Sequence, residues 1–258
     1  QGIEYGLQGL NYLGIVLPID PVSVEIAIVQ EQTRLDSQLK QRPISQISQL
    51  PMMTNPRQLI ELQLLCNLNA CAHIYGNISF ASLATLRGLN AILKSGNSDL
   101  TVIQLAWYAM LLVQKEDYPL ALDVAEETIR LSQQHSHFRE MSNCHNLLAS
   151  MVLYFRRSYD DCIALHQQGY EIGLDNGEIA RAVINLGNIL FLMLSKGGTL
   201  EEVKKHAHLV QRLRDQKAVF YPVSACLIKV VDALMEPSDL ASEAIDDDAF
   251  SASYLKKI

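Results

Sequence analysis

Residues 109–128, AMLLVQKEDYPLALDVAEET, align without a gap with residues 150–169, SMVLYFRRSYDDCIALHQQG, which lie 41 positions further along the chain. Small residues recur at the same places in both stretches. They pair Ala109 with Ser150, Ala121 with Cys162 and Thr128 with Gly169. Because only small side chains let the backbones of two helices come close, the pattern predicts a repeat of helical hairpins.

The same small positions recur in a unit 37 residues earlier, at Ala72, Ala84 and Ala91. Apolar residues at helical spacing continue on both sides of these units and predict an all-α chain. We expect helices over residues 22–40, 57–75, 80–94, 100–115, 119–134, 138–156, 159–174, 178–194, 200–214 and 221–235. Glycine also stands where the end of a helix favours a left-handed residue, at Gly96, Gly177 and Gly197.

Both ends of the sequence read as parts of further helices. Gly2, Gly6 and Gly9 fall at the small positions of the second helix of a hairpin, so we expect the native chain to continue upstream. Beyond Pro237 the chain is acidic and reads either as a linker and the start of another helix or as a disordered tail. We therefore expect one helical-repeat domain over 1–236, with an inserted helix near 22–40, followed by an acidic linker and the start of a further helix over 237–258.

The repeat resembles the tetratricopeptide repeat. That pattern has a small residue midway in the first helix, an aromatic residue before the second helix, and two small residues within it. Ala109, Tyr118, Ala121 and Thr128 follow this order. The units of 37 to 41 residues are longer than the usual repeat of about 34. The resemblance implies a right-handed superhelix, or α-solenoid, of antiparallel helical hairpins.

The N-terminal part resembles a more particular family. Residues 5–18, YGLQGLNYLGIVLP, are followed by a polar helix and then by the turn LPMMTNP at residues 50–56. This layout is similar to the helical region of large bacterial proteins that join an AAA/STAND-type ATPase to a sensor histidine kinase or diguanylate cyclase, and residues 243–250, EAIDDDAF, resemble a linker in that region. The resemblance implies a non-catalytic segment that couples an ATPase or kinase-like module to an output domain and binds protein or peptide, with flanking domains of the same chain as partners.

Composition excludes several other classes. The net charge is −7 and the Lys and Arg residues are scattered, whereas nucleic acid requires a basic stripe. No apolar run reaches the roughly 20 residues that span a bilayer, and the best candidate, 182–194, contains Asn185 and Asn188. No signal-peptide pattern is visible. The five cysteines lack the spacing of a disulfide framework, which indicates a cytoplasmic protein.

No motif of nucleotide hydrolysis, serine hydrolysis or metal-dependent proteolysis occurs, so we expect no enzyme activity, no cofactor and no catalytic residue. A metal could be held by histidine and cysteine at His135, His137, Cys144 and His145, but we favour an ordinary polar turn. The acidic pairs could mark an active site, but we favour a solvated helix face. They are Glu126 with Glu127 and Asp160 with Asp161.

The first helix of each hairpin in such an array also lines the concave surface. By repeat position, the residues expected to contact a partner there are Met110, Gln114, Leu147, Met151 and Tyr154. An apolar concavity of this kind marks a binding site when it is exposed. Three interpretations stay open: the superhelix packs on itself or on a neighbouring domain, it binds protein or peptide, or it holds a small-molecule effector. The sequence also leaves a homo-oligomer open.

Overall fold

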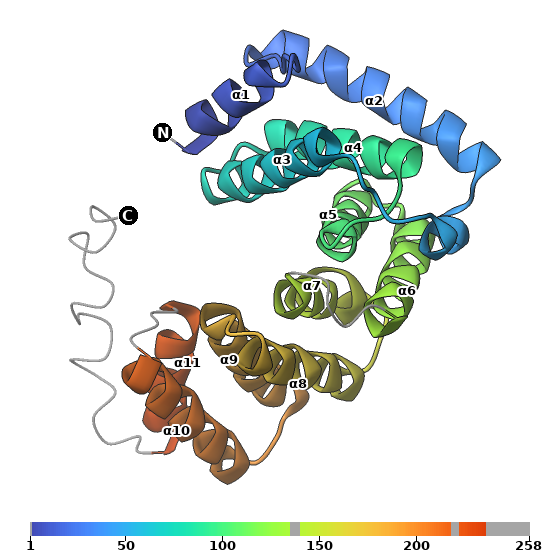
Figure 1. Cartoon of the computed structure of the whole chain (residues 1–258). Coiled ribbons are helices and arrows are strands. Elements are labelled where there is room, and N and C mark those ends of the chain that lie inside the picture. Colours follow the sequence, from blue (N-terminus) through green and yellow to red (C-terminus); the bar gives the residue numbers. More distant parts are fainter. Residues whose placement is uncertain (1, 135–139, 218–221, 236–258) are drawn as a thin grey trace. The chain divides into compact units, whose positions relative to one another are not determined.

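The computed structural model describes residues 2–134, 140–217 and 222–235, and within these ranges the chain is helical, with no strand (Figure 1). The fold class is therefore all-α, as predicted. The chain divides into two compact units, Gln1–Leu153 and Tyr154–Ile258. The acidic linker and further helix predicted over 237–258 lie outside the described residues.

The first unit begins with two helices and a short 3-10 turn, followed by two hairpins and a last irregular helix. Its elements are α1 (Gly2–Tyr12), α2 (Pro21–Gln41), η1 (Ile44–Gln49), α3 (Pro56–Ile74), α4 (Ile78–Ser95), α5 (Thr101–Gln114), α6 (Tyr118–Gln134), α7 (Met141–Leu147) and η2 (Leu148–Val152). Helix α3 packs along α4 and α5 along α6, so these two of the predicted hairpins form. Helix α1 packs on α3, α2 on α4, and α7 with η2 on α5.

The small residues do what the repeat pattern predicts. A Cβ atom added at Gly6 of α1 would lie 2.5 Å from Cδ2 of Leu68 on α3. One added at Gly88 of α4 would lie 2.4 Å from Nε2 of Gln104 on α5. A side chain at either position would force the buried Leu68 or Gln104 side chain to move. Glycine therefore favours the close approach of these helices, at Gly6 as predicted and at Gly88, which the repeat pattern had not singled out.

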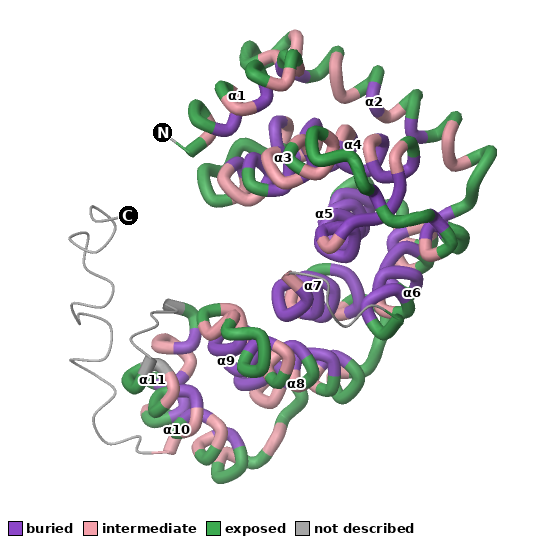
Figure 2. Tube along the Cα trace, viewed as in Figure 1, coloured by how far each residue is buried: buried purple, intermediate pink, exposed green. Residues whose placement is uncertain are grey.

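Helix α5 is the centre of the first unit. Its residues from Thr101 to Leu112 are all buried, and Figure 2 shows α5 and α7 almost entirely in the colour of buried residues. A helix that is apolar on every side belongs in the interior of a protein. Trp107 also stacks on His73 of α3, with ring centroids 4.5 Å apart.

The helix predicted over 138–156 is not regular. Residues 138 and 139 lie outside the described residues; after them come α7, a π-helical turn at η2 and a 3-10 turn at η3 (Leu153–Phe155). A π turn encloses one more residue than an α turn, so the change of hydrogen bonding takes up an extra residue within the helix. The sequence periodicity could not reveal this, because both kinds of turn place apolar residues on one side.

The described part of the second unit, as far as residue 235, contains four α-helices. They are α8 (Tyr159–Asp175), α9 (Ile179–Lys196), α10 (Leu200–Lys217) and α11 (Pro222–Met235). At the α8–α9 contact His166 Nδ1 donates a hydrogen bond to Asn185 Oδ1 at 2.9 Å, and both side chains are buried. A Cβ at Gly169 would lie 2.7 Å from that same oxygen, so a small residue is again required where two helices meet.

Positive φ angles confirm the predicted glycine positions at helix ends. The values are 110° at Gly96, 75° at Gly177 and 79° at Gly197. One helix of the described part, α9, is long and apolar enough to cross a membrane by length and composition. A core helix can pass the same test, and α9 contains the buried Asn185 and packs on α8, α10 and α11 within the second unit.

Acid should destabilise the protein through a buried histidine on α7. Burial lowers the pKa of His145 below its usual value of about 6.5, and its Nδ1 donates to the Met141 carbonyl at 2.8 Å. A depressed folded-state pKa gives stability that is complete above the unfolded pKa and is lost as the pH falls through the folded value. We expect the thermal midpoint to fall between about pH 7 and pH 5.5, and His145→Gln to reduce that slope. An equal reduction by His208→Gln, at an exposed position on α10, would contradict this cause.

Candidate functional site: the inserted segment

The inserted helix predicted over 22–40 is α2, and a polar network fixes it to α4. Glu31 is buried, and its carboxylate lies 3.4 Å from Arg87 and accepts a hydrogen bond from Asn90 Nδ2 at 2.7 Å. Gln38 Nε2 donates to Asn90 Oδ1 at 2.9 Å. A further contact joins Lys115 Nζ to Gln32 Oε1 at 2.8 Å. Several polar contacts with defined geometry therefore set the position of α2.

A second polar group ties η1 to α6. Glu127 is buried and pairs with Arg130 one turn later on the same helix. The Glu127 carboxylate accepts a hydrogen bond from the Ser48 N–H at 3.2 Å, while Arg130 Nη2 donates to the Ser45 carbonyl at 2.8 Å. These bonds join residues about 80 positions apart in sequence. The short turn η1 is consequently held against α6 at both of its ends.

The chain after η1 is anchored to the loop between α4 and α5. Met53 N donates to the Asn97 carbonyl at 2.6 Å, and Asn97 N donates to the Pro51 carbonyl at 2.8 Å. The Asn97 side chain is buried and donates to the Ile47 carbonyl at 2.8 Å. Gly96 makes this close approach possible, because a Cβ there would lie 2.3 Å from the Pro51 oxygen.

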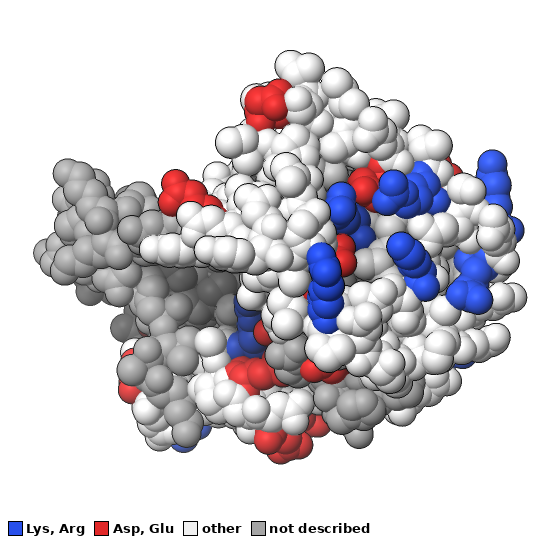
Figure 3. Space-filling view, turned by 45° about the horizontal axis from the view of Figure 1, so that its top comes forward, with Lys and Arg blue, Asp and Glu red and all other residues white. Residues whose placement is uncertain are grey.

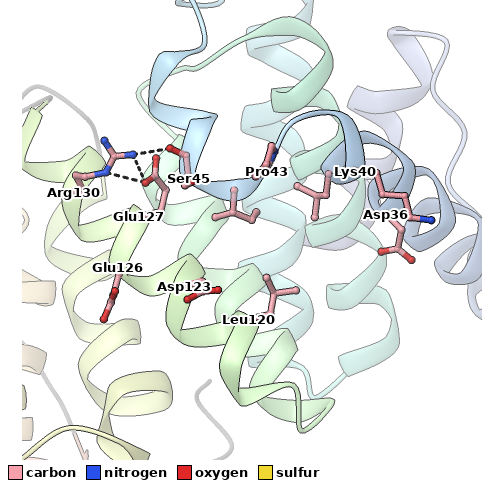
Figure 4. A pocket seen from close by; sticks show the side chains of 11 residues that line it. Asp36, Lys40, Pro43, Ser45, Leu120, Asp123, Glu126, Glu127 and Arg130 are labelled. Atoms are coloured by element: carbon pink, nitrogen blue, oxygen red, sulfur yellow. Dashed lines mark hydrogen bonds and ion pairs between the residues drawn. The ribbon is translucent and has the colours of Figure 1, made fainter.

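These anchors leave a pocket of about 760 Å³ between the end of α2, η1 and α6 (Figure 4). Its apolar lining comes from Leu39, Pro43, Ile44 and Leu120. Its charged lining comes from Asp36, Lys40, Asp123, Glu126, Glu127 and Arg130. Figure 4 shows Asp36 and Lys40 approaching from α2 on one side and Leu120 and Asp123 from α6 on the other. The volume falls in the range of known ligand pockets.

The outer face of α2 is the second notable surface of the inserted segment. Val22, Ile26 and Val29 follow one face of the helix at spacings of four and three residues and are 71%, 54% and 65% exposed. Large apolar residues just before the helix are also exposed, at Tyr12, Val16 and Ile19. Figure 3 shows a broad uncharged area on the face that is turned forward, with basic side chains gathered on one side of it.

The predicted partner residues do not share one environment. Met110 on α5 and Leu147 on α7 are buried, and these two helices pack together, so both side chains belong to the core of the first unit. Gln114 and Met151 are exposed in the first unit. Tyr154 lies in the second unit, half-buried, where its ring packs near Tyr159 and Phe191.

The residues weighed for chemistry have structural roles in the described parts. The acidic pair on α6 is split, because Glu126 is exposed at the pocket whereas Glu127 is buried with Arg130. Asp160 pairs with Lys196, and Asp161 interacts with Ser158 at the start of α8.

No group of three or more His, Cys, Asp or Glu side chains within the described residues could hold a metal ion. His135 and His137 lie outside those residues. Cys144 is fully buried, and burial raises the pKa of its thiol. The thiolate, which is the form that binds metals, is therefore disfavoured at this position.

Comparison with protein-family models, with curated proteins and with solved structures gave no match to this chain. The candidate site thus rests on the chain's own geometry. The sequence did not predict the pocket, because it is made by bonds between segments that lie far apart in the chain. The apolar positions on the outer face of α2 were visible in the sequence, but a helical spacing alone does not say which apolar face is buried.

Proposed function

We propose that this chain is a non-catalytic protein-interaction segment, and that the outer face of α2 is its main docking surface. The observation that supports it is the exposure of Val22, Ile26 and Val29 on a helix whose opposite face is already packed on α4. Contiguous exposed apolar side chains mark interaction sites more often than ordinary surface. A face spaced in this way fits the helix-in-groove mode of recognition.

A protein partner fits this face better than a lipid surface. Helices that lie on membranes carry Lys and Arg along the flanks of the apolar face, where these residues meet anionic headgroups. Along residues 20–41, the charged residues nearest in sequence to Val22, Ile26 and Val29 are acidic, namely Asp20 and Glu25. Arg34 and Lys40 lie only further along, in the second half of the helix.

The sequence motifs support a proposal about the kind of protein that contains this segment. In this proposal the hairpins continue as a right-handed superhelix within a cytoplasmic bacterial signalling protein. The segment couples an ATPase or kinase-like module to an output domain, and its partners are the flanking domains of the same chain. The helical hairpins α3–α4 and α5–α6 support the first part, and the YGLQGLNYLGIVLP and LPMMTNP stretches support the second. The array would act by binding one state of the larger assembly more tightly than another.

Acidic substitutions on the outer face should weaken binding. We expect Ile26→Asp with Val29→Asp to lower the affinity of the purified chain for the neighbouring modules of its protein by about tenfold or more, measured by titration calorimetry. The matched control is Ile74→Asp, at a residue of α3 that is 75% exposed. The proposal fails if the chain binds none of the neighbouring modules, or if the control weakens binding as much as the double variant.

A further inference from the structure

We infer that the pocket between α2, η1 and α6 receives an arginine or lysine side chain from a peptide segment of the partner; this inference rests on the proposed function and identifies the chemistry of a second contact. The outer face of α2 supplies apolar contact, whereas the pocket supplies charge. Both belong to the inserted segment, so one partner chain could occupy both.

The charge of the pocket selects a cation. Four of its side chains are carboxylates and two are cationic. One of the cations, Arg130, already pairs with Glu127 and donates to the Ser45 carbonyl. The other cation, Lys40, is exposed, and three exposed carboxylates remain in the lining: Asp36 on α2 and Asp123 and Glu126 on α6. A cationic group bound in the pocket would therefore meet acidic side chains on both helices.

The apolar part of the lining favours a cationic group that is carried on a long chain of methylene groups. Ile44 is buried and Leu39 and Leu120 are half-buried, whereas the carboxylates of Asp36, Asp123 and Glu126 are exposed. Arginine and lysine bury their methylene groups against apolar surface while the charged end stays near water. This distribution of apolar and acidic groups therefore fits such a side chain, whereas a phosphate or carboxylate ligand would meet like charge.

A peptide is favoured over a free small cation. Ion pairs with solvent-exposed carboxylates contribute little to affinity, too little to hold an isolated amine. A peptide adds main-chain and neighbouring side-chain contacts to the same pair. The pocket is also formed before binding, because Glu127 and Arg130 hold η1 on one side and Asn97 holds it on the other. A preformed site lowers the ordering cost of binding.

The test uses a random peptide library displayed on phage and selected on the immobilised chain. We expect the selected peptides to share an arginine or lysine next to apolar residues. We expect this motif to disappear when selection is repeated on Asp36→Asn with Asp123→Asn, and to persist on Asp175→Asn, a control at an exposed carboxylate of α8. The best peptide should lose about three- to tenfold in affinity on the double variant, and similarly when its basic residue is replaced by neutral citrulline.

Each other outcome has a defined meaning. A selected motif without a basic residue, equal binding of the arginine and citrulline peptides, or recovery of no peptide would overturn the inference. Competition by agmatine at the same concentration as the peptide would assign the pocket to a free alkylguanidine and would also overturn it. The proposed function is tested separately, because binding of the neighbouring modules through the outer face of α2 can persist when the pocket fails.

Discussion

Gly96→Ala is expected to lower the free energy of unfolding of the first unit by about 3–5 kcal/mol. Two costs combine at this residue. Its φ of 110° and ψ of 179° lie in a region that only glycine adopts without strain. A Cβ atom would also lie 2.3 Å from the Pro51 carbonyl oxygen, which is backbone and cannot rotate away. Thermal unfolding followed by circular dichroism should show a fall of roughly 10 °C or more.

Gly76→Ala is the matched control in the same unit. Its φ is 72°, yet a Cβ there meets no atom within 4 Å, so only backbone strain of about 1 kcal/mol is expected. The difference between the two variants isolates the contact with Pro51. Equal losses of stability would show that the bridge between Asn97 and the chain after η1 is not formed in solution.

Glu31→Ala is expected to cost about 2–3 kcal/mol. The Glu31 carboxylate is buried and pairs with Arg87, which is itself only 28% exposed, and it accepts a hydrogen bond from Asn90. Removing it leaves the mostly buried Arg87 cation without this partner, and such an orphaned charge is costly. The Asn90 amide loses one hydrogen bond but keeps the one to the Glu31 main-chain carbonyl at 2.9 Å. Urea unfolding monitored by circular dichroism at neutral pH measures the loss.

A double substitution shows whether the stability lost in Glu31→Ala comes from the unpaired charge of Arg87 or from a loss of helix packing. Replacing both partners, as in Glu31→Met with Arg87→Leu, should recover much of the lost stability, because an apolar pair of similar volume leaves no unpaired charge. Gln30→Ala, at an exposed position on the same helix, should change stability by about 0.5 kcal/mol or less. If Glu31→Ala were no more damaging than Gln30→Ala, the polar network would not be what holds α2 on α4.

The helices could be predicted from sequence because their causes are local. The inserted polar helix was predicted at 22–40, and the structure places it at Pro21–Gln41. The glycines of α1 were recognised as close-approach positions, and Gly6 does approach Leu68 on α3. Periodicity and small side chains report on neighbours within a few turns, so they predict helix boundaries and hairpin contacts well.

The site could not be predicted in the same way. Glu126 and Glu127 looked like one solvated pair, but contacts from η1, nearly 80 residues earlier, bury only Glu127. Met110 was named as a concave-surface residue, with packing of the array on itself left open, and it is buried on α5, on which α4, α6 and α7 all pack. Such outcomes depend on which segments meet in three dimensions, and a single sequence does not state that.

Photo-crosslinking from Ile26 in the full-length protein tests the docking surface most directly. A benzoylphenylalanine placed at Ile26 should form a crosslink on irradiation to a protein partner, which our proposal places in a flanking domain of the same chain, identified by mass spectrometry of the digested product. The same group at Glu171, an exposed position on α8, serves as the reference. A crosslink from position 26 well above that reference is the predicted result. Equal and weak crosslinking from both positions would contradict the claim that the outer face of α2 docks a partner.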